Sequence, residues 1–267
     1  MSIYGFIGCG NMGGALANAA SKKLGGGELL LANKTHAKAE KLAANIGGEA
    51  VTNAVIAKQA DYIWLGVKPQ MMADMLADIA PILAERTDRF VLVSMAAGLT
   101  IARIREMAGG VYPVIRIMPN TPAAIGQGMI LYTSDGVTEE ELAAYLDVMS
   151  AAGRFDQLPE HLIDAGSAVS GCGPAFVYPF IEALADGGVL CGLPRAKAQE
   201  YAAQTLIGAA MLVLESGQHP GALKDAVCSP GGSTIAGVRK LEEGGFRATA
   251  MNAVIAACEK TKDLGKN

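Results

Sequence analysis

Two glycine-rich loops in this chain of 267 residues carry groups that suit the binding of anions. One loop, Gly8–Gly13, reads Gly-Cys-Gly-Asn-Met-Gly, and the other, Ser229–Thr234, reads Ser-Pro-Gly-Gly-Ser-Thr. Each loop leads into a predicted helix, whose first N–H groups lack partners within the helix and whose dipole favours negative charge. We expect the first loop to hold the pyrophosphate of a dinucleotide and the second to hold a small carboxylate. Hydride transfer between a nicotinamide and a small acid requires both.

The first loop matches the G-x-G-x-x-G pattern in its required context, because a strand pattern precedes it and a helix pattern follows it. Gly8 is expected to make the turn, Gly10 to admit the pyrophosphate, and Gly13 to let the helix pack on the strand. A glycine-rich turn without a ligand is the alternative interpretation. The loop residues assigned to the cofactor are Gly8, Gly10, Asn11, Met12 and Gly13.

The residues that follow the second predicted strand indicate which dinucleotide binds. Sites for NAD usually place an Asp or Glu there for the ribose 2′-hydroxyl, but this chain has Asn33, Lys34 and Thr35. An amide, an ammonium and a hydroxyl are donors that suit a 2′-phosphate, so the sequence favours NADPH, with NADH possible. An ordinary solvated loop lysine is the alternative for Lys34.

A second candidate contact follows the third predicted strand, where the sequence reads Val67-Lys68-Pro69. Ligands of open α/β sheets bind at the carboxyl ends of the strands. We therefore expect Lys68 to lie over the cofactor, with Val67 and Pro69 beside it. A surface turn stopped by proline is the alternative.

The elements that must position these loops alternate between strand and helix in the first part of the chain. This pattern predicts an α/β fold, a Rossmann-type doubly wound and mostly parallel sheet. The continuous Val, Ile and Leu runs are typical of strands buried on both faces. The predicted strands are 3–7, 29–32, 62–67, 90–94, 112–118 and 129–132, and the predicted helices between them are 11–24, 37–46, 71–83, 101–107 and 139–151.

The pattern changes after Pro159, from which point we expect helices alone, over about 160–191, 194–216, 219–228, 233–243 and 246–263. These helices are dense in Ala and Gly, which lets them approach closely, and their apolar surface suggests a partner subunit. We predict two domains: an NADP-binding Rossmann domain over 1–159, and an all-helical domain for substrate binding and dimerisation over 160–267.

Composition excludes several other classes of protein. Apolar residues make up 51% of the chain and charged residues 18%, which indicates a globular protein. The net charge of −4 disfavours nucleic-acid binding, which needs a basic face. The apolar run at 206–214 is too short to span a bilayer and the start of the chain lacks a signal pattern, so we expect a soluble cytoplasmic protein without a membrane partner. The five cysteines and three histidines have no metal-ligand spacing, and no metal is expected.

Five motifs together resemble the pyrroline-5-carboxylate reductase family. They are Gly8–Gly13, Val67–Pro69, Met118–Pro122, Ser170–Phe176 and His219–Thr234. The resemblance covers essentially the whole chain, and the last motif is highly specific to the family. Two departures are mild: Cys172 stands where the family often has Ser, and Phe176 where it often has Tyr.

The resemblance implies an enzyme that reduces the C=N bond of L-1-pyrroline-5-carboxylate to L-proline with NADPH or NADH, the last step of proline biosynthesis. It also implies a homodimer through intertwined C-terminal helices, commonly assembled into a ring of dimers. The active site of the family lies between the nucleotide domain of one subunit and helices that include the partner's. Further cofactor contacts are assigned to Asn53, Ala96, Ala97 and Asn120.

The same resemblance places the substrate carboxylate on Ser229, Gly232, Ser233 and Thr234, and Glu160 is also assigned to the substrate. Backbone N–H groups and hydroxyls stabilise an oxyanion without burying a counter-cation. We assign Thr234 as the catalytic residue, through a hydrogen bond to the ring nitrogen. A helix cap is the alternative role for its hydroxyl.

Two other functions fit the sequence less well. A β-hydroxyacid dehydrogenase shares the two-domain plan, but its catalytic Lys and Asn positions are occupied here by Val177 and Phe180, which cannot transfer protons. A non-catalytic NADP-binding regulator is the other, and cofactor oxidation on addition of substrate would separate it from an enzyme.

Overall fold

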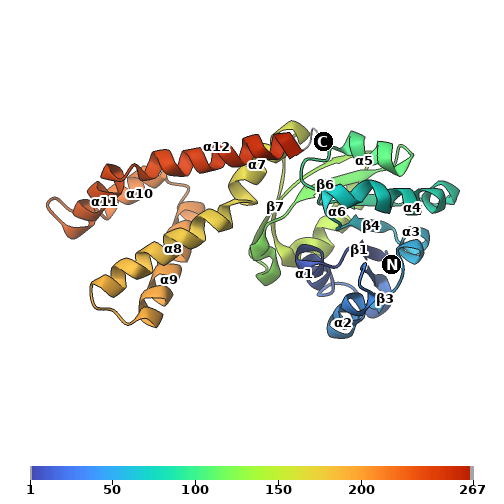
Figure 1. The fold of residues 1–267 in the computed structure, drawn as a ribbon, viewed down its shortest axis with the longest axis horizontal. Coiled ribbons are helices and arrows are strands. Elements are labelled where there is room, and N and C mark those ends of the chain that lie inside the picture. Colours follow the sequence, from blue (N-terminus) through green and yellow to red (C-terminus); the bar gives the residue numbers. More distant parts are fainter. Residues whose placement is uncertain (1, 265–267) are drawn as a thin grey trace. The chain divides into compact units, whose positions relative to one another are not determined.

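The computed structural model describes residues 2–264, so the end of the second predicted domain, 265–267, lies outside the described residues. The contacts divide the chain into two compact units (Figure 1). The first unit runs to Cys172 and includes the chain again from Ala257, and the second is Gly173–Ala256. The sequence placed a functional boundary at 159/160, and the helix Glu160–Ser170 (α7) lies between the two positions. It is grouped with the first unit because Ile163 packs with Met118 and Leu131 of the sheet.

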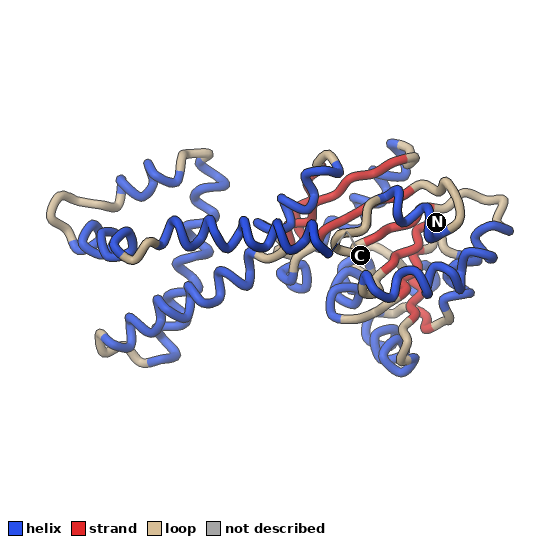
Figure 2. Tube along the Cα trace, turned by 45° about the horizontal axis from the view of Figure 1, so that its top comes forward, coloured by secondary structure: helices blue, strands red, loops and turns tan. Residues whose placement is uncertain are grey.

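The first unit is built on one sheet of eight strands in the order β3-β2-β1-β4-β5-β6-β7-β8 (Figure 2). Every pairing is parallel except that of β6 with β7. The strand order reverses at β1, which lies between β2 and β4. The strands are Tyr4–Ile7 (β1), Leu29–Ala32 (β2), Glu49–Ala50 (β3), Tyr62–Leu65 (β4), Val91–Ser94 (β5), Val114–Met118 (β6), Gly128–Asp135 (β7) and Gly153–Gln157 (β8).

Helices cover both faces of this sheet, which confirms the predicted doubly wound fold. The helices of the first unit, besides α7, are Asn11–Ala20 (α1), His36–Ile46 (α2), Asn53–Gln59 (α3), Met72–Glu85 (α4), Ile101–Ala108 (α5) and Glu139–Met149 (α6). Side chains along a strand alternate between two cores. Tyr4 and Phe6 of β1 pack with Leu16 of α1, while Ile7 packs with Ile56 of α3. Burial on both faces is why the strands read as unbroken apolar runs.

Three short elements were absent from the sequence prediction. They are β3, α3 and β8. The strand β3 has two residues, too few to show a period, and β8 is polar and largely exposed because it lies at the edge of the sheet. The helix α3 has seven residues, and its start is set by the Thr52 hydroxyl, which accepts the Val55 N–H at 3.3 Å.

The second unit is helical, as predicted. Its helices are Gly173–Leu190 (α8), Arg195–Ser216 (α9), Pro220–Ala226 (α10), Ser233–Glu243 (α11) and Phe246–Leu264 (α12), of which α12 ends in the first unit. Helices α8 and α9 lie side by side (Figure 1). Their contact buries Ala185, Ala198 and Ala202, and these three alanines form the buried apolar cluster of this unit.

The second unit therefore leaves many large apolar side chains exposed. Leu190 is 89% exposed, Leu214 is 71% exposed, and Tyr178, Val227 and Met251 are each 60–64% exposed. Exposed apolar patches of this extent mark surfaces that bind a partner or a membrane.

Among the described residues, one helical stretch, Glu160–Leu190, is long and apolar enough to cross a bilayer, judged by length and composition alone. Its 18-residue apolar segment has a mean hydropathy of 1.2, and 11% of that segment is buried. The sequence analysis expected no stretch of sufficient length. The difference arises because this stretch joins α7 to α8 across Gly171 and Cys172. A long apolar helix of this kind can also pack against another protein chain, so length and composition do not distinguish the two cases.

Candidate active site

The loop Gly8–Gly13 begins at the carboxyl end of β1, at the point where the strand order reverses. Gly8 has a φ of +99°, and a Cβ there would lie 2.6 Å from the carbonyl of Gly66. A Cβ on Gly13 would lie 2.2 Å from the carbonyl oxygen of Gly8. Both positions therefore require glycine, in the roles that the sequence predicted: a tight turn, and a helix held against the strand.

Gly10 differs from these two glycines, because a Cβ there would meet no protein atom within 4 Å. Gly10 instead lines a cavity of about 550 Å³. It is also the N-cap of α1, which has no side-chain cap, so the first N–H groups of the helix remain available to a ligand. Open space at Gly10 together with free N–H groups fits the close approach of a pyrophosphate.

The cavity brings together the carboxyl ends of β1, β2 and β4, where the three strands lie side by side. It collects seven of the residues that the sequence assigned to the cofactor: Gly8, Gly10, Asn33, Lys34, Asn53, Val67 and Lys68. Asn11, Met12, Gly13, Thr35, Pro69, Ala96, Ala97 and Asn120 are not among its lining residues. Cofactor contacts stay predictions for all fifteen residues, both the seven that line the cavity and the eight that do not.

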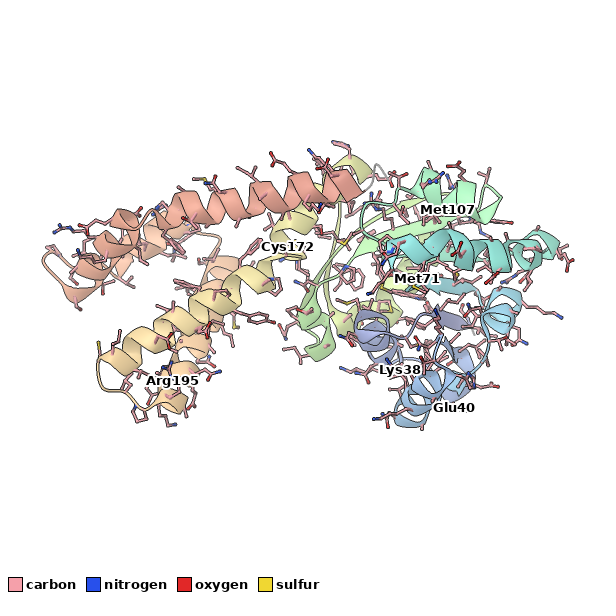
Figure 3. The ribbon with its side chains drawn as sticks, in the orientation of Figure 1. Lys38, Glu40, Met71, Met107, Cys172 and Arg195 are labelled. Atoms are coloured by element: carbon pink, nitrogen blue, oxygen red, sulfur yellow. The ribbon has the colours of Figure 1, made fainter. Side chains whose placement is uncertain are left out.

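The sequence analysis missed one wall of the cavity. Met71, Asp74, Met75 and Asp78 line it from the start of α4 (Figure 3 labels Met71). Their spacing of three, one and three residues places them on one face of a helix. That spacing, directly after Val67-Lys68-Pro69, was the signal that could have identified them.

A smaller recess of about 460 Å³ adjoins the end of β2. It shares Asn33, Lys34 and Asn53 with the larger cavity. Asn33 donates from Nδ2 to the carbonyl of Thr35 at 3.2 Å, which shapes the turn between β2 and α2. No Asp or Glu is among the lining residues of the recess. A 2′-phosphate fits this charge pattern better than a ribose 2′-hydroxyl does.

Cys9 lies inside the glycine loop but is a packing residue. Burial raises the pKa of its thiol to about 11, and the thiol donates to the carbonyl of Phe6 at 3.7 Å. A thiol with a raised pKa holds little thiolate at neutral pH and is a poor nucleophile.

The side chain of Asn120 is already engaged within the first unit. Its Nδ2 donates to the carbonyl of Ser170 at 3.0 Å, and its Oδ1 accepts the N–H of Met129 at 3.0 Å. The amide thus ties the start of β7 to the end of α7. These contacts give Asn120 a structural role that the sequence did not predict.

Glu160 is held in the same way by neighbours in the first unit. Its Oε1 accepts the N–H of Ile101 at 2.7 Å, at the start of α5, and lies 3.4 Å from the guanidinium of Arg116. Arg116 is 2% exposed and pairs with Asp164 at 2.7 Å. Glu160 therefore belongs to a partly buried ion cluster that joins α7, β6 and α5, and its contact with a substrate stays a prediction.

The loop Ser229–Thr234 lies wholly in the second unit. Gly231 has a φ of +67°, and the N–H of Gly232 donates to the carbonyl of Ser229 at 3.0 Å, which closes a tight turn. Gly232 then caps α11 without a side-chain hydrogen bond. The first N–H groups of this helix, beginning at Ser233 and Thr234, are left for a ligand.

The structure corrects the alternative role of Thr234. A helix cap precedes the first helical residue, but Thr234 is the second residue of α11 and Gly232 is the cap. Among the hydrogen bonds of the described residues, none involves the hydroxyls of Ser229, Ser233 or Thr234, and all three residues are exposed. Three hydroxyls and the start of a helix thus surround one turn, an arrangement suited to a carboxylate.

Models of known protein families match both parts of the chain. The family model for pyrroline-5-carboxylate reductase dimerisation matches residues 160–264, and the model for coenzyme F420-dependent NADP oxidoreductases matches residues 3–98. The pyrroline-5-carboxylate reductase of Escherichia coli is 42% identical over 98% of both chains, and that of Methanosarcina acetivorans is 42% identical over 98% of this chain and 97% of its own.

Solved structures lead to the same family. The pyrroline carboxylate reductase of Plasmodium falciparum, with NADP bound, has a TM-score of 0.88 at 34% identity and covers 99% of this chain and 98% of its own. The 1-pyrroline-5-carboxylate reductase of Streptococcus pyogenes has a TM-score of 0.87 at 32% identity over 98% of both chains. Relatives that match this chain from end to end at these identities give one conclusion: this chain belongs to the pyrroline-5-carboxylate reductase family.

Proposed function

We propose that this chain reduces the C=N bond of L-1-pyrroline-5-carboxylate to give L-proline, with NADPH as the preferred reductant and NADH as an alternative. The observation that carries the proposal is the pairing, in one chain, of a dinucleotide cavity at β1, β2 and β4 with an exposed hydroxyl loop at the start of α11. Relatives of this length and identity are named for the same reaction.

The residues of the first unit hold the cofactor. Gly10 and the free N–H groups of α1 receive the pyrophosphate, and Lys34 and Asn33 receive the ribose with its 2′-phosphate. Bound there, the dihydronicotinamide supplies a hydride. The protein's own contribution is to orient the ring and to place charge around it.

The loop of the second unit holds the substrate by its carboxylate. The N–H groups at the start of α11 and the hydroxyls of Ser229 and Ser233 stabilise the anion. The Thr234 hydroxyl forms a hydrogen bond to the ring nitrogen. The protonated imine carbon is electrophilic, so it accepts the hydride without a strong acid from the protein.

A spectrophotometric assay tests this function. The full chain is mixed with L-1-pyrroline-5-carboxylate and either NADPH or NADH, and the loss of the reduced nicotinamide is followed. We expect oxidation of the cofactor that depends on the substrate and yields L-proline. Cofactor binding without oxidation would instead favour a non-catalytic NADP-binding regulator.

Replacing Thr234 with alanine is expected to lower kcat/KM by roughly tenfold or more, equivalent to about 1.4 kcal/mol. The affinity for NADPH is expected to stay close to that of the unchanged protein, because Thr234 lies in the second unit and the cofactor cavity lies in the first. Stability is expected to change little, since the hydroxyl caps no helix. Steady-state kinetics, cofactor titration and melting of one preparation measure all three, and a normal kcat/KM would remove Thr234 from catalysis.

We propose further that the second unit forms a homodimer, and that dimers assemble into a ring. Its apolar surface includes Tyr201, Ile207 and Met211, each more than half exposed, around a core of three alanines. A second copy of the same unit supplies a matching apolar surface, and the family model for this region is one of dimerisation. In this assembly the apolar stretch Glu160–Leu190 packs on protein rather than on lipid. The cytoplasmic location expected from the sequence stays a prediction.

Analytical ultracentrifugation tests the assembly. We expect a sedimenting mass of at least two chains in buffer without detergent, and no binding to phospholipid vesicles. A stable monomer with full activity would contradict the dimer, and recovery of the chain with the vesicles would assign the apolar surface to a membrane.

A further inference from the structure

We propose that His36 is a specificity-determining residue for the cofactor: its protonated form contacts the 2′-phosphate of NADPH, so the contribution of His36 to the preference for NADPH over NADH increases as the pH falls. The inference rests on the proposed function, because it requires that the cavity of the first unit be the NADP(H) site. The sequence analysis assigned no role to His36.

His36 reaches the cofactor region through the smaller recess. That recess is lined by Ala32, Asn33, Lys34, His36, Val51, Thr52 and Asn53. Three of these residues also line the larger cavity, so the two spaces adjoin at the end of β2. His36 lines the recess but not the larger cavity. A group that extends from the ribose beyond Asn33 and Lys34 therefore meets the imidazole.

Charge is distributed unevenly between the two spaces. Asp74 and Asp78 line the larger cavity from α4, whereas the charged or titratable residues that line the recess are Lys34 and His36. Thr52 and Asn53, which line the recess from the start of α3, are neutral. A phosphate with up to two negative charges is therefore stabilised in the recess and repelled by the wall formed by α4.

The helix that carries His36 adds to this attraction. His36 is the first residue of α2, which has eleven residues, no acidic residue in its first turn and no side-chain cap. The positive end of the helix dipole therefore acts on the same recess without compensation. Two separate features, a pair of basic side chains and an uncapped helix start, favour an anion at one place.

Glu40 is the group that competes with a phosphate for His36. Its Oε1 lies 3.5 Å from Nε2 of His36, one turn along α2, and the two side chains are 61% and 56% exposed (Figure 3 labels Glu40 and Lys38 on this helix). An exposed pair of this kind contributes little to stability. A phosphate in the recess can therefore displace the carboxylate, with little loss of stability, as the partner of a protonated imidazole.

The pH dependence follows from the chemistry of the two partners. An imidazole changes its charge between about pH 5 and pH 8. A phosphate monoester takes up its second proton near about pH 6, which weakens its binding to any cation. These effects oppose each other at low pH, so the contribution of His36 is read from the difference between the unchanged protein and a variant at the same pH.

Two measurements on the full chain test the inference at about pH 6.5, within the range in which an imidazole takes up its proton, and at about pH 8.5, above that range. The first is the affinity for adenosine 2′,5′-diphosphate relative to adenosine 5′-monophosphate, which differ by the 2′-phosphate alone. The second is the ratio of kcat/KM for NADPH to that for NADH. The variants are His36→Gln and, as a matched control, His161→Gln, since His161 is exposed on α7 and lines neither space.

We expect His36→Gln to lower both ratios by about five- to tenfold at the lower pH and by less than about twofold at the higher pH, because only the protonated imidazole contributes a charge. His161→Gln is expected to behave like the unchanged protein at both values. The same loss at both pH values, or no loss at either, would overturn the role of His36. Failure of the proposed function is distinct, since it would abolish oxidation of both cofactors on addition of substrate.

Two further variants identify the group that responds to pH. Lys34→Gln is expected to lower the preference for the 2′-phosphate at both pH values and to keep the pH response, because a lysine stays charged throughout this range. Glu40→Gln is expected to raise the affinity for adenosine 2′,5′-diphosphate at both values, because it removes a nearby negative charge. A pH response that disappears in Lys34→Gln but persists in His36→Gln would overturn the inference.

Discussion

Replacing Asp164 with asparagine is expected to lower the free energy of unfolding by about 3 kcal/mol. Asp164 is the nearest partner of Arg116, at 2.7 Å, and Arg116 is 2% exposed on β6. Without that carboxylate, Glu160, at 3.4 Å, is the one acidic partner left to the guanidinium among residues 2–264, and its Nε already lacks a partner among the same residues. A charge left underpaired in the interior costs far more than a surface pair contributes.

The exposed pair of Arg103 and Glu106 on α5 provides the control for this prediction. These side chains are 54% and 67% exposed, so Glu106→Gln is expected to change the free energy of unfolding by less than about 0.5 kcal/mol. Urea denaturation at one fixed protein concentration measures both variants, since a dimer's apparent stability depends on concentration. If the two substitutions cost the same, the ion cluster contributes no more than a surface ion pair.

A double variant separates the charge of Arg116 from its packing. Replacing Arg116 with methionine as well removes the underpaired charge. The methionine fills the same place in the sheet with an apolar side chain of similar length. The double variant Arg116→Met, Asp164→Asn is therefore expected to be more stable than Asp164→Asn alone. A double variant that is less stable than the single one would show that the packing of Arg116, rather than its charge, dominates.

The sequence predicted the elements that are governed by local rules. The strand Leu29–Ala32 and the helix Ser233–Glu243 have the bounds that the patterns indicated, because one is an unbroken apolar run and the other begins directly after a glycine turn. The sequence also predicted that the carboxyl ends of β1, β2 and β4 lie together, since ligands of a doubly wound sheet bind at that edge. The cavity at these strand ends, with seven of the residues that line it, followed from that rule.

Elements that depend on distant contacts were not predictable in this way. His36 was assigned no role from the sequence, because its recess is completed by Val51, Thr52 and Asn53, which follow an edge strand of two residues. Glu160 shows the converse: it was assigned to a ligand, yet the structure gives it Arg116 and the N–H of Ile101 as partners. An arginine inside the apolar strand Val114–Met118 was the signal for that cluster, since a buried charge requires partners elsewhere in the chain.

Replacing Gly10 with alanine is expected to weaken the binding of NADPH by on the order of 100-fold, equivalent to about 2.7 kcal/mol. A Cβ at Gly10 meets no protein atom within 4 Å, because it points into open space beside the cavity that Gly10 lines. The added methyl group therefore occupies the space where the backbone must approach the pyrophosphate. The free energy of unfolding is expected to change by less than about 1 kcal/mol, the difference between glycine and alanine at a helix N-cap.

Two matched glycine substitutions separate the loss of binding from the loss of folding. Gly13→Ala places its Cβ 2.2 Å from the carbonyl oxygen of Gly8, so it is expected to reduce stability as well as binding. Gly27→Ala adds a methyl group at an exposed turn with nothing within 4 Å, so it is expected to change neither. Isothermal titration with NADPH and urea denaturation of the three variants give the comparison. Normal NADPH affinity in Gly10→Ala would place the pyrophosphate away from the start of α1, because a methyl group beside a bound phosphate cannot be accommodated without moving either the helix or the ligand.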